Sequence, residues 1–193
     1  MAVKIIGITG KARAGKDTVG KIVCDTLPNC HWYALAMPIK DALFGMLGVD
    51  DPSRRAALMV NKEEAIPYLG VSPRQILQDI GKAMRDSAGE DFWLHFLQQH
   101  LDVWSSLDSI YETPTTTYIV ITDVRYDNEA KFIKERGGAI WRVTRPDAAK
   151  VRDHESERGI SDEYVDVEID NSKAIEQLEQ KVKQLLKENY NND

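Results

Sequence analysis

"GITGKARAGKDT", residues 7–18, decides the fold that we predict for this chain of 193 residues. It contains Gly10, Gly15 and Lys16 in the spacing G-x-x-x-x-G-K of a phosphate-binding loop. A β-branched apolar run, residues 3–9, precedes the loop, and a helical pattern follows it. Glycines let successive N–H groups turn toward phosphate oxygens, and the following helix directs its positive end at the same anion. The residues of this predicted loop are Gly10, Lys11, Ala12, Arg13, Ala14, Gly15, Lys16, Asp17 and Thr18.

The residues after the second glycine are the ones expected to meet the nucleotide phosphates and a metal ion. Lys16 would reach the β- and γ-phosphates as a point charge. Asp17 stands where such loops usually carry a serine or threonine for Mg²⁺, and Thr18 follows directly. Because Mg²⁺ prefers hard oxygen ligands, Asp17 could bind it directly or through water, or Thr18 could do so if the first helical turn shifts. The alternative is that Asp17 only complements the positive end of the helix.

Strands and helices alternate along the rest of the chain. Strands are expected at 31–36, 118–122, 139–144 and 165–169, and helices at 18–27, 39–47, 91–107, 129–136 and 173–188, with one more from Ser72–Pro73 onward. Asn171 and Ser172 would cap the last helix. Residues 48–73 are mixed in character and look like an excursion from the core. The alternation predicts an α/β fold with a parallel central sheet and helices on both faces.

Composition limits the classes of partner. Hydrophobic residues make up 42% of the chain, which is enough for one substantial core. The net charge of −6 provides no general positive field for a nucleic-acid polymer, so any anion must be captured locally. Cys24 and Cys30 match no metal or redox spacing and are interpreted as reduced thiols. Since no apolar run approaches the roughly 20 residues of a membrane span and no signal-peptide pattern opens the chain, we expect a soluble cytoplasmic protein.

Two quoted stretches carry a resemblance to a known family. "GKARAGKDT", residues 10–18, and "VITDVRYDNEA", residues 120–130, resemble the deoxynucleoside monophosphate kinases of bacteriophages. The likeness extends through "SPRQILQDIGKAMR", "FW", "NEAKFIKERGGAIWRV" and "HESE". It implies transfer of the γ-phosphate of ATP to a deoxynucleoside monophosphate with Mg²⁺, in the host cytoplasm if the chain is phage-encoded.

The resemblance also implies an architecture. It suggests a three-layer P-loop kinase fold forming a single domain over residues 1–193. A helical acceptor-binding insertion is expected at about 48–110 and a mobile lid at about 145–163. Small-molecule nucleotides would be the ligands, and a homodimer is a further implication. No motif of the family can be quoted for residues of about 48–70, so the preferred base stays open.

The helix that begins at Pro73 carries a polar stripe. Arg74, Gln78, Gly81 and Arg85 follow spacings of four, three and four, which place them on one narrow helical face. Guanidinium groups hold phosphate through two parallel bonds. The stripe therefore predicts a cradle for a monophosphate and its base, with an ordinary solvated helix face as the alternative.

Three charged residues follow the strongest strand signal. Side chains beyond the carboxyl ends of parallel strands project into the ligand crevice of such folds. Asp123 would help to orient Mg²⁺ or its waters. By the resemblance, Arg125 would contact the acceptor phosphate, and Glu129 would contact the sugar or Arg125 itself. The alternative is that an Asp–Arg pair caps the next helix, with Asn128 as its N-cap.

The polar segment after residue 144 is the expected lid. In monophosphate kinases, mobile arginines close over the transferred group and neutralise its charge. Arg145 and either Arg152 or Arg158 are the candidates, with His154 as a hydrogen-bonding spacer. Trp93 could stack on the acceptor base, although core packing explains an indole there equally well.

Two other functions fit parts of the sequence. A kinase for another small phosphorylated acceptor, such as dephospho-coenzyme A, would share the fold, but Asp17 weighs against it. A non-catalytic P-loop switch would bind a nucleotide and would have no need for the stripe of Arg74, Gln78 and Arg85.

Overall fold

The computed structural model describes residues 3–107, 116–146 and 158–190. The chain forms two compact units. The first, called the sheet unit here, comprises Met1–Ala34 and Leu97–Asp193, and the second, the helical unit, comprises Leu35–Phe96.

Five parallel strands form the centre of the sheet unit, in the order β2-β3-β1-β4-β5. The strands are β1 (Val3–Thr9), β2 (Cys30–Tyr33), β3 (Thr117–Val124), β4 (Ala139–Thr144) and β5 (Val167–Asp170). β3 is buried along almost its whole length, as expected of an interior parallel strand covered on both faces. The sheet confirms the predicted α/β class.

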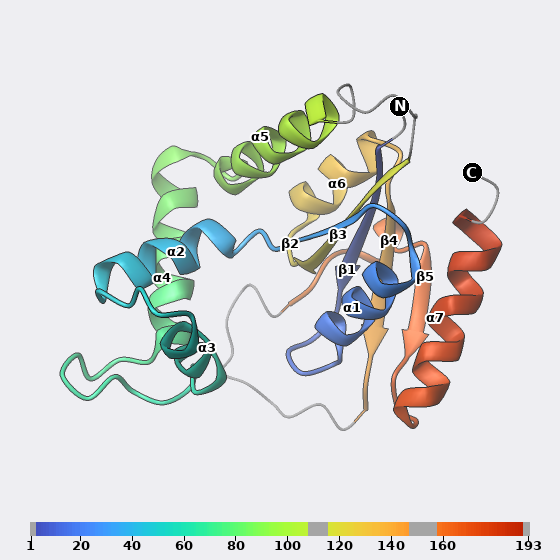
Figure 1. Ribbon diagram of the computed structural model, residues 1–193. Coiled ribbons are helices and arrows are strands. Elements are labelled where there is room, and N and C mark those ends of the chain that lie inside the picture. Colours follow the sequence, from blue (N-terminus) through green and yellow to red (C-terminus); the bar gives the residue numbers. More distant parts are fainter. Residues whose placement is uncertain (1–2, 108–115, 147–157, 191–193) are drawn as a thin grey trace. The chain divides into compact units, whose positions relative to one another are not determined.

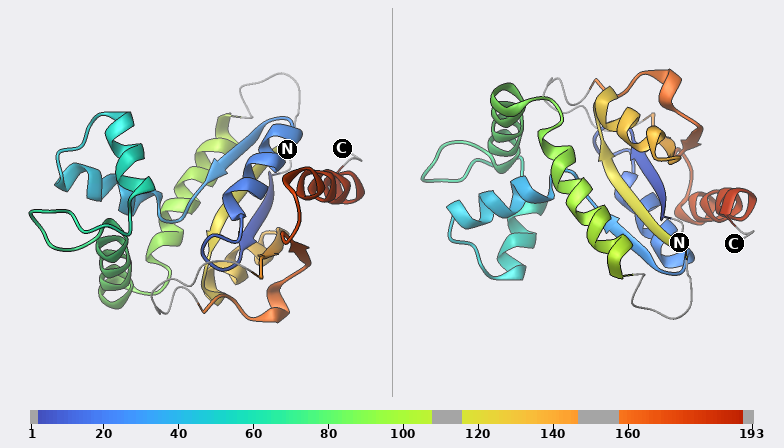
Figure 2. Two further views of the ribbon diagram at one scale, coloured as in Figure 1. Left: turned by 90° about the horizontal axis from the view of Figure 1, so that it is seen from below. Right: turned by 90° about the horizontal axis from the view of Figure 1, so that it is seen from above.

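Helices cover both faces of this sheet (Figures 1 and 2). α1 (Lys16–Thr26) and α7 (Ile175–Tyr190) contact each other on one face, and α6 (Asp127–Glu135) lies on the other. Val19, Val182 and Ile169 belong to the buried apolar cluster between α1, α7 and the sheet. α5 (Phe92–Leu107) starts in the helical unit and continues into the sheet unit. Within the described ranges, no helix has the length and apolar character needed to cross a membrane.

The helical unit contains α2 (Met37–Met46), α3 (Pro52–Val60), α4 (Pro73–Ala88) and the start of α5. The Ser72 hydroxyl accepts the Gln75 N–H at 3.2 Å, which confirms the predicted start of α4. α3 lies in the stretch where no helix was predicted. It starts with the same signal, since the Asp51 carboxylate accepts the Arg54 N–H and proline follows the cap. None of its side chains is buried, so apolar periodicity gave no indication of it.

Two of the predicted boundaries that differ from the structure have a clear local cause. β2 ends at Tyr33 instead of residue 36, because pairing with β3 stops there and the next residues lead into the helical unit. α6 begins at Asp127, before the expected cap Asn128, because Tyr126 takes the N-cap position.

The cysteines are also placed differently from the prediction. Cys24 of α1 and Cys30 of β2 form a disulfide, with their Cα atoms 5.0 Å apart. The prediction of two reduced thiols is therefore wrong. The pairing arises because α1 ends at Thr26 and the chain turns back through Asn29, which has a φ of 47°, to begin β2.

Candidate active site

The phosphate-binding loop connects β1 to α1 and has the backbone that its glycines allow. Gly10 and Gly15 have φ angles of 141° and 102°, which glycine adopts without strain. A Cβ on Gly10 would lie 2.3 Å from the Val143 carbonyl oxygen of β4, so only glycine fits against that strand. Arg13, with a φ of 63°, is left-handed as well. The loop thus curls tightly between two strands of the sheet and the start of α1.

Lys16 folds back over this loop. Its Nζ donates to the Gly10 carbonyl at 2.7 Å and to the Lys11 carbonyl at 2.9 Å. The ammonium group is therefore held above the loop in which the backbone N–H groups would meet phosphate. Asp17 and Thr18 are exposed in the first turn of α1, where the helix end is positive.

Asn171, which the sequence analysis assigned to a helix cap, instead braces the phosphate loop. It follows β5, and its Nδ2 donates to the Ala14 carbonyl at 2.8 Å. α7 begins only at Ile175, because Ser172 turns back to bond the Asp170 carboxylate through its hydroxyl and its N–H. The sequence did contain a signal for a site role of Asn171, because this residue directly follows a predicted strand. The carboxyl ends of parallel strands meet at the ligand-binding edge of the sheet.

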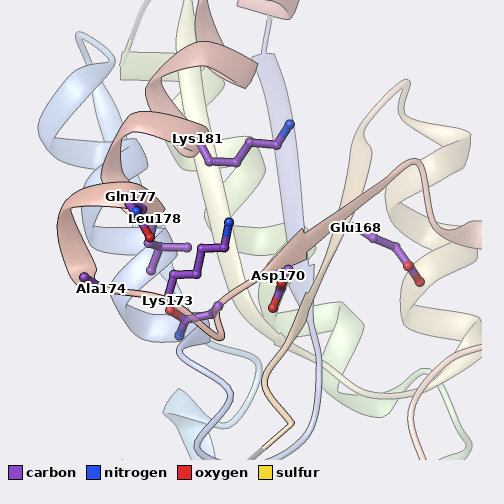
Figure 3. Close-up of a pocket in the computed structure, with 8 residues that line it drawn as sticks. Glu168, Asp170, Lys173, Ala174, Gln177, Leu178 and Lys181 are labelled. Atoms are coloured by element: carbon purple, nitrogen blue, oxygen red, sulfur yellow. The ribbon is translucent and has the colours of Figure 1, made fainter.

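A cavity adjoins this connection between β5 and α7. Its volume is about 390 Å³. Figure 3 shows Glu168 and Asp170 of β5 on one side, and Lys173 and Lys181 on the other. Asn171 also lines the cavity, which therefore lies next to the loop that Asn171 braces.

Asp123 and Arg125 stand at the carboxyl end of β3, and Glu129 lies beneath them in α6. The buried Glu129 carboxylate accepts the backbone N–H of Arg125 at 2.7 Å and that of Tyr126 at 3.1 Å. Burial raises the pKa of Glu129 to about 7 and the charge of Asp123 adds to the rise, while the two N–H donors and Arg125 oppose it. Glu129 thus fixes the backbone that carries Arg125 and begins α6.

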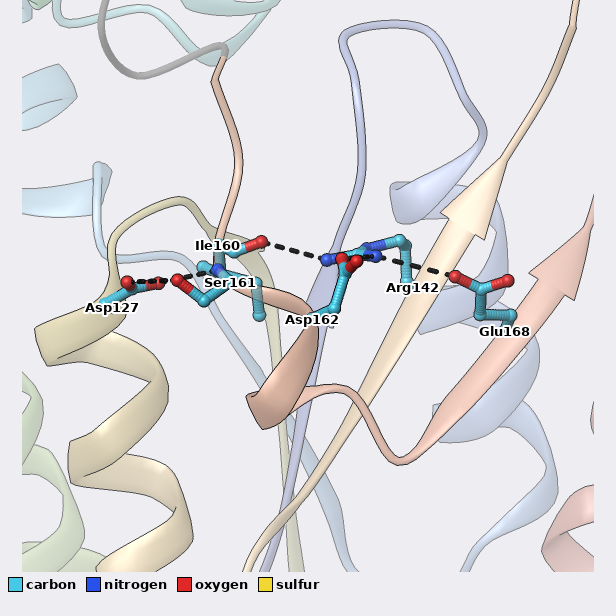
Figure 4. A network of polar contacts seen from close by, with 6 residues as sticks. All are labelled: Asp127, Arg142, Ile160, Ser161, Asp162 and Glu168. Carbon is cyan, nitrogen blue, oxygen red and sulfur yellow. Dashed lines mark hydrogen bonds and ion pairs between the residues drawn. The ribbon is translucent and has the colours of Figure 1, made fainter.

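The range expected as the lid is only partly described. Arg145, directly after β4, and Arg158 are both exposed, whereas Arg152 and His154 lie outside the described residues. The far end of the range is anchored to the sheet unit (Figure 4). Arg142 of β4 pairs with Asp162 and donates to the Ile160 carbonyl.

A second contact in Figure 4 completes this anchor. The N–H and hydroxyl of Ser161 donate to the two carboxylate oxygens of Asp127, at 2.7 and 2.6 Å. Because Asp127 opens α6, the chain that returns from the expected lid is bound to the helix that follows Arg125.

The predicted stripe of α4 lies in the helical unit. Arg74 is largely buried, and its Nε is 2.5 Å from the Glu63 carboxylate. The Nε2 of Gln78 is buried and has no hydrogen-bond partner among the residues that the structure describes. Arg85 is half-buried, and its guanidinium group lies beside Gly81. Its Nη1 is 3.8 Å from the point where a Cβ on that glycine would be.

Trp93 is buried in the same unit. Its indole N–H donates to the Gly81 carbonyl at 3.1 Å, and its ring packs against Phe92 and Phe96. The indole of Trp93 therefore packs within the core of the helical unit, which was the alternative to stacking on the acceptor base.

The comparisons with known proteins all indicate the same family. The model of the deoxynucleotide monophosphate kinase family matches residues 4–68 and 53–182, two overlapping segments. A protein of Acanthamoeba polyphaga mimivirus, assigned as a deoxynucleotide monophosphate kinase, is 28% identical over 90% of this chain and 91% of its own length. The deoxynucleoside-5'-monophosphate kinase of Escherichia phage T5 is 25% identical over 86% of this chain and 89% of its own. The deoxynucleotide monophosphate kinase of Enterobacteria phage T4 is 26% identical over 95% and 99%, respectively.

Proposed function

Because the chain belongs to the deoxynucleotide monophosphate kinase family, we propose that it transfers the γ-phosphoryl group of ATP to a deoxynucleoside monophosphate, giving ADP and a deoxynucleoside diphosphate. One observation carries the proposal within the sheet unit. The curled loop with Lys16 folded over it and the Asp123–Arg125 strand end both lie at the edge where parallel strands end.

The ATP side is formed by the phosphate loop. Its N–H groups and the start of α1 offer partial positive charge to the phosphates. Lys16 would exchange the Gly10 and Lys11 carbonyls for β- and γ-phosphate oxygens. Asn171 would support the shape of the loop through its hydrogen bond to the Ala14 carbonyl.

Asp123, with either Asp17 or Thr18, would hold Mg²⁺ together with nucleotide oxygens. The donor set fits this ion, since all three offer hard oxygens and none is fully buried. When bound, Mg²⁺ neutralises charge on the bridged phosphates. Few protein ligands are needed, because Mg²⁺ keeps waters and takes substrate phosphate as a ligand.

The acceptor side requires cations of fixed direction. Arg125, whose backbone Glu129 holds, would bring the acceptor phosphate in line. In the helical unit, Arg74 or Arg85 of α4 is the cation that the polar stripe offers to the acceptor. Gln78 offers the base an amide N–H that has no partner within the described chain.

No general base is required for this transfer, because a phosphate monoester is already largely an oxyanion near neutral pH. Of the lid candidates, Arg145 and either Arg152 or Arg158 would offset the charge on the transferred group, and His154 would serve as a spacer.

The direct test measures ADP release with ATP–Mg²⁺ and each of dGMP, dTMP, dCMP and dAMP. We expect turnover with at least one acceptor and none with dephospho-coenzyme A. ATP binding without any acceptor-dependent ADP release would instead indicate a nucleotide switch and would overturn the proposal.

Two pairs of variants assign the two sides of the site. Lys16→Ala should lower turnover by at least about 100-fold with every acceptor, whereas Lys21→Ala, an exposed lysine of the same helix paired with Asp25, should not. Arg125→Ala should raise the acceptor KM at least about 10-fold and leave ATP affinity within about twofold, with Arg136→Ala as the control. Unchanged acceptor kinetics in Arg125→Ala would contradict the assignment of the β3 end.

A further inference from the structure

Tyr33 ends β2 on the face of the sheet that α5 covers. It pairs with Ile121 of β3, so Asp123, two residues further along, lies on the same face just beyond the end of β2. The ring is 1% exposed, and its centroid lies 4.8 Å from that of His100 and 6.0 Å from that of Trp104, both in α5. All of these residues belong to the sheet unit.

The hydroxyl of Tyr33 is not explained by packing. Its oxygen is buried and has no hydrogen-bond partner within the part of the chain that the structure describes. A phenylalanine would fill the same space without burying an unsatisfied polar group, which costs free energy. Burial raises the pKa of Tyr33 to about 12 and the negative charge of Asp123 adds to the rise, so the hydroxyl stays a donor at any working pH.

We propose that Tyr33 is a positioning residue, whose hydroxyl donates to the Asp123 carboxylate once the nucleotide site is filled. The proposal rests on the proposed function, which uses Asp123 beside the phosphates. A nucleotide cannot reach the hydroxyl directly, because the ring lies beneath α5. The half-buried Asp123 is the charged group that acts on the hydroxyl from the strand end. Such a hydrogen bond would fix the direction of the carboxylate that we propose for Mg²⁺.

Tyr33→Phe tests this role by removing one oxygen atom. We expect kcat to fall about 10-fold and the half-saturating Mg²⁺ concentration to rise at least threefold, with the KM values for ATP and the acceptor within about twofold. The thermal midpoint without ligands should stay the same or rise, because an unsatisfied hydroxyl is removed. The extra stabilisation that Mg²⁺ gives to the ADP-bound protein should shrink. Tyr118→Phe, at a buried tyrosine at the other end of β3, is the control and should change neither kcat nor the Mg²⁺ dependence.

A double-mutant cycle separates positioning from a structural role. If Tyr33 acts through Asp123, Tyr33→Phe should have little further effect on kcat or on Mg²⁺ dependence in an Asp123→Ala background, which has no side-chain acceptor. Additive losses, or a Tyr33→Phe variant with wild-type kcat and Mg²⁺ dependence, would overturn the proposal. If the wild-type protein phosphorylates no deoxynucleotide, the proposed function has failed. The Mg²⁺-dependent stabilisation by ADP then still tests the Tyr33–Asp123 link, and equal stabilisation in wild type and Tyr33→Phe would overturn it.

Discussion

Gly15 occupies a position in the phosphate loop that has room for a hydrogen atom but not for a methyl group. Its φ of 102° is unfavourable for any residue with a side chain. A Cβ there would lie 2.3 Å from the Nδ2 of Asn171, which is already bonded to the Ala14 carbonyl. Relieving the clash would therefore break the contact that braces the loop.

Gly15→Ala should accordingly damage both stability and nucleotide binding. We expect the free energy of unfolding to fall by about 1–2 kcal/mol and the Kd for ATP to rise at least about 10-fold. Urea unfolding and titration with ATP measure the two effects. Gly45→Ala in α2 is a suitable control, because a Cβ there meets nothing within 4 Å, and it should be neutral or stabilising by up to about 1 kcal/mol. Wild-type ATP affinity in Gly15→Ala would show that the loop is not constrained in this way.

At the level of elements, the start of α6 depends on the buried carboxyl group of Glu129. The hydrogen bonds and the positive charge around it offset only part of the cost of burying its negative charge. Glu129 closes a capping box and holds the N–H groups of Arg125 and Tyr126. Its pKa is raised from 4.5 to about 7, so the folded state binds the proton more tightly than the unfolded chain. The stability from protonated Glu129 is complete below about pH 4.5 and is lost as the pH rises toward 7 and beyond.

Glu129→Gln isolates this pH dependence. The amide oxygen can still accept both N–H groups, but it does not titrate. We expect the stability of the wild type relative to the variant to fall by on the order of 3 kcal/mol between about pH 4.5 and pH 8. Chemical denaturation across this pH range measures the difference, with Glu135→Gln, exposed at the end of α6, as the control. A constant difference would mean that Glu129 does not carry the shifted pKa.

The elements that were predicted correctly carry local signals. The loop spacing, the apolar run of β3 and the Ser72–Pro73 start of α4 can each be recognised within a few neighbouring residues. The features that were missed depend on how the chain folds back on itself. Asn171 is 157 residues away in sequence from the carbonyl that it binds, so nothing in its neighbourhood distinguishes a loop brace from a helix cap. The pairing of Cys24 with Cys30 was missed for a related reason. Only the turn after α1 brings their Cα atoms to a distance that a disulfide can span.

For the sheet unit as a whole, strand order gathers the candidate site at one edge. With all strands parallel and β1 flanked by β3 and β4, the carboxyl ends of the five strands lie together. Tyr33 ends β2, and Asp123 is the second-last residue of β3. Arg145 and Asn171 directly follow β4 and β5, and the phosphate loop follows β1. The disulfide is placed away from this edge, because Cys24 is eight residues into α1 and Cys30 opens β2 at its amino end.

This placement predicts that the disulfide affects global stability without affecting turnover. Closing a loop of seven residues restricts the unfolded chain, and the loop-entropy relation gives about 2 kcal/mol. Reduction of the wild type with dithiothreitol should lower its free energy of unfolding by that amount and leave kcat unchanged. The Cys24→Ser/Cys30→Ser protein should match the reduced wild type and should not respond to dithiothreitol. Because the effect acts through the unfolded ensemble, it should appear in urea unfolding and be absent from ATP titrations of the native protein. Two thiols that titrate in the unreduced native protein, together with stability that is insensitive to reductant, would show that the link does not form in solution.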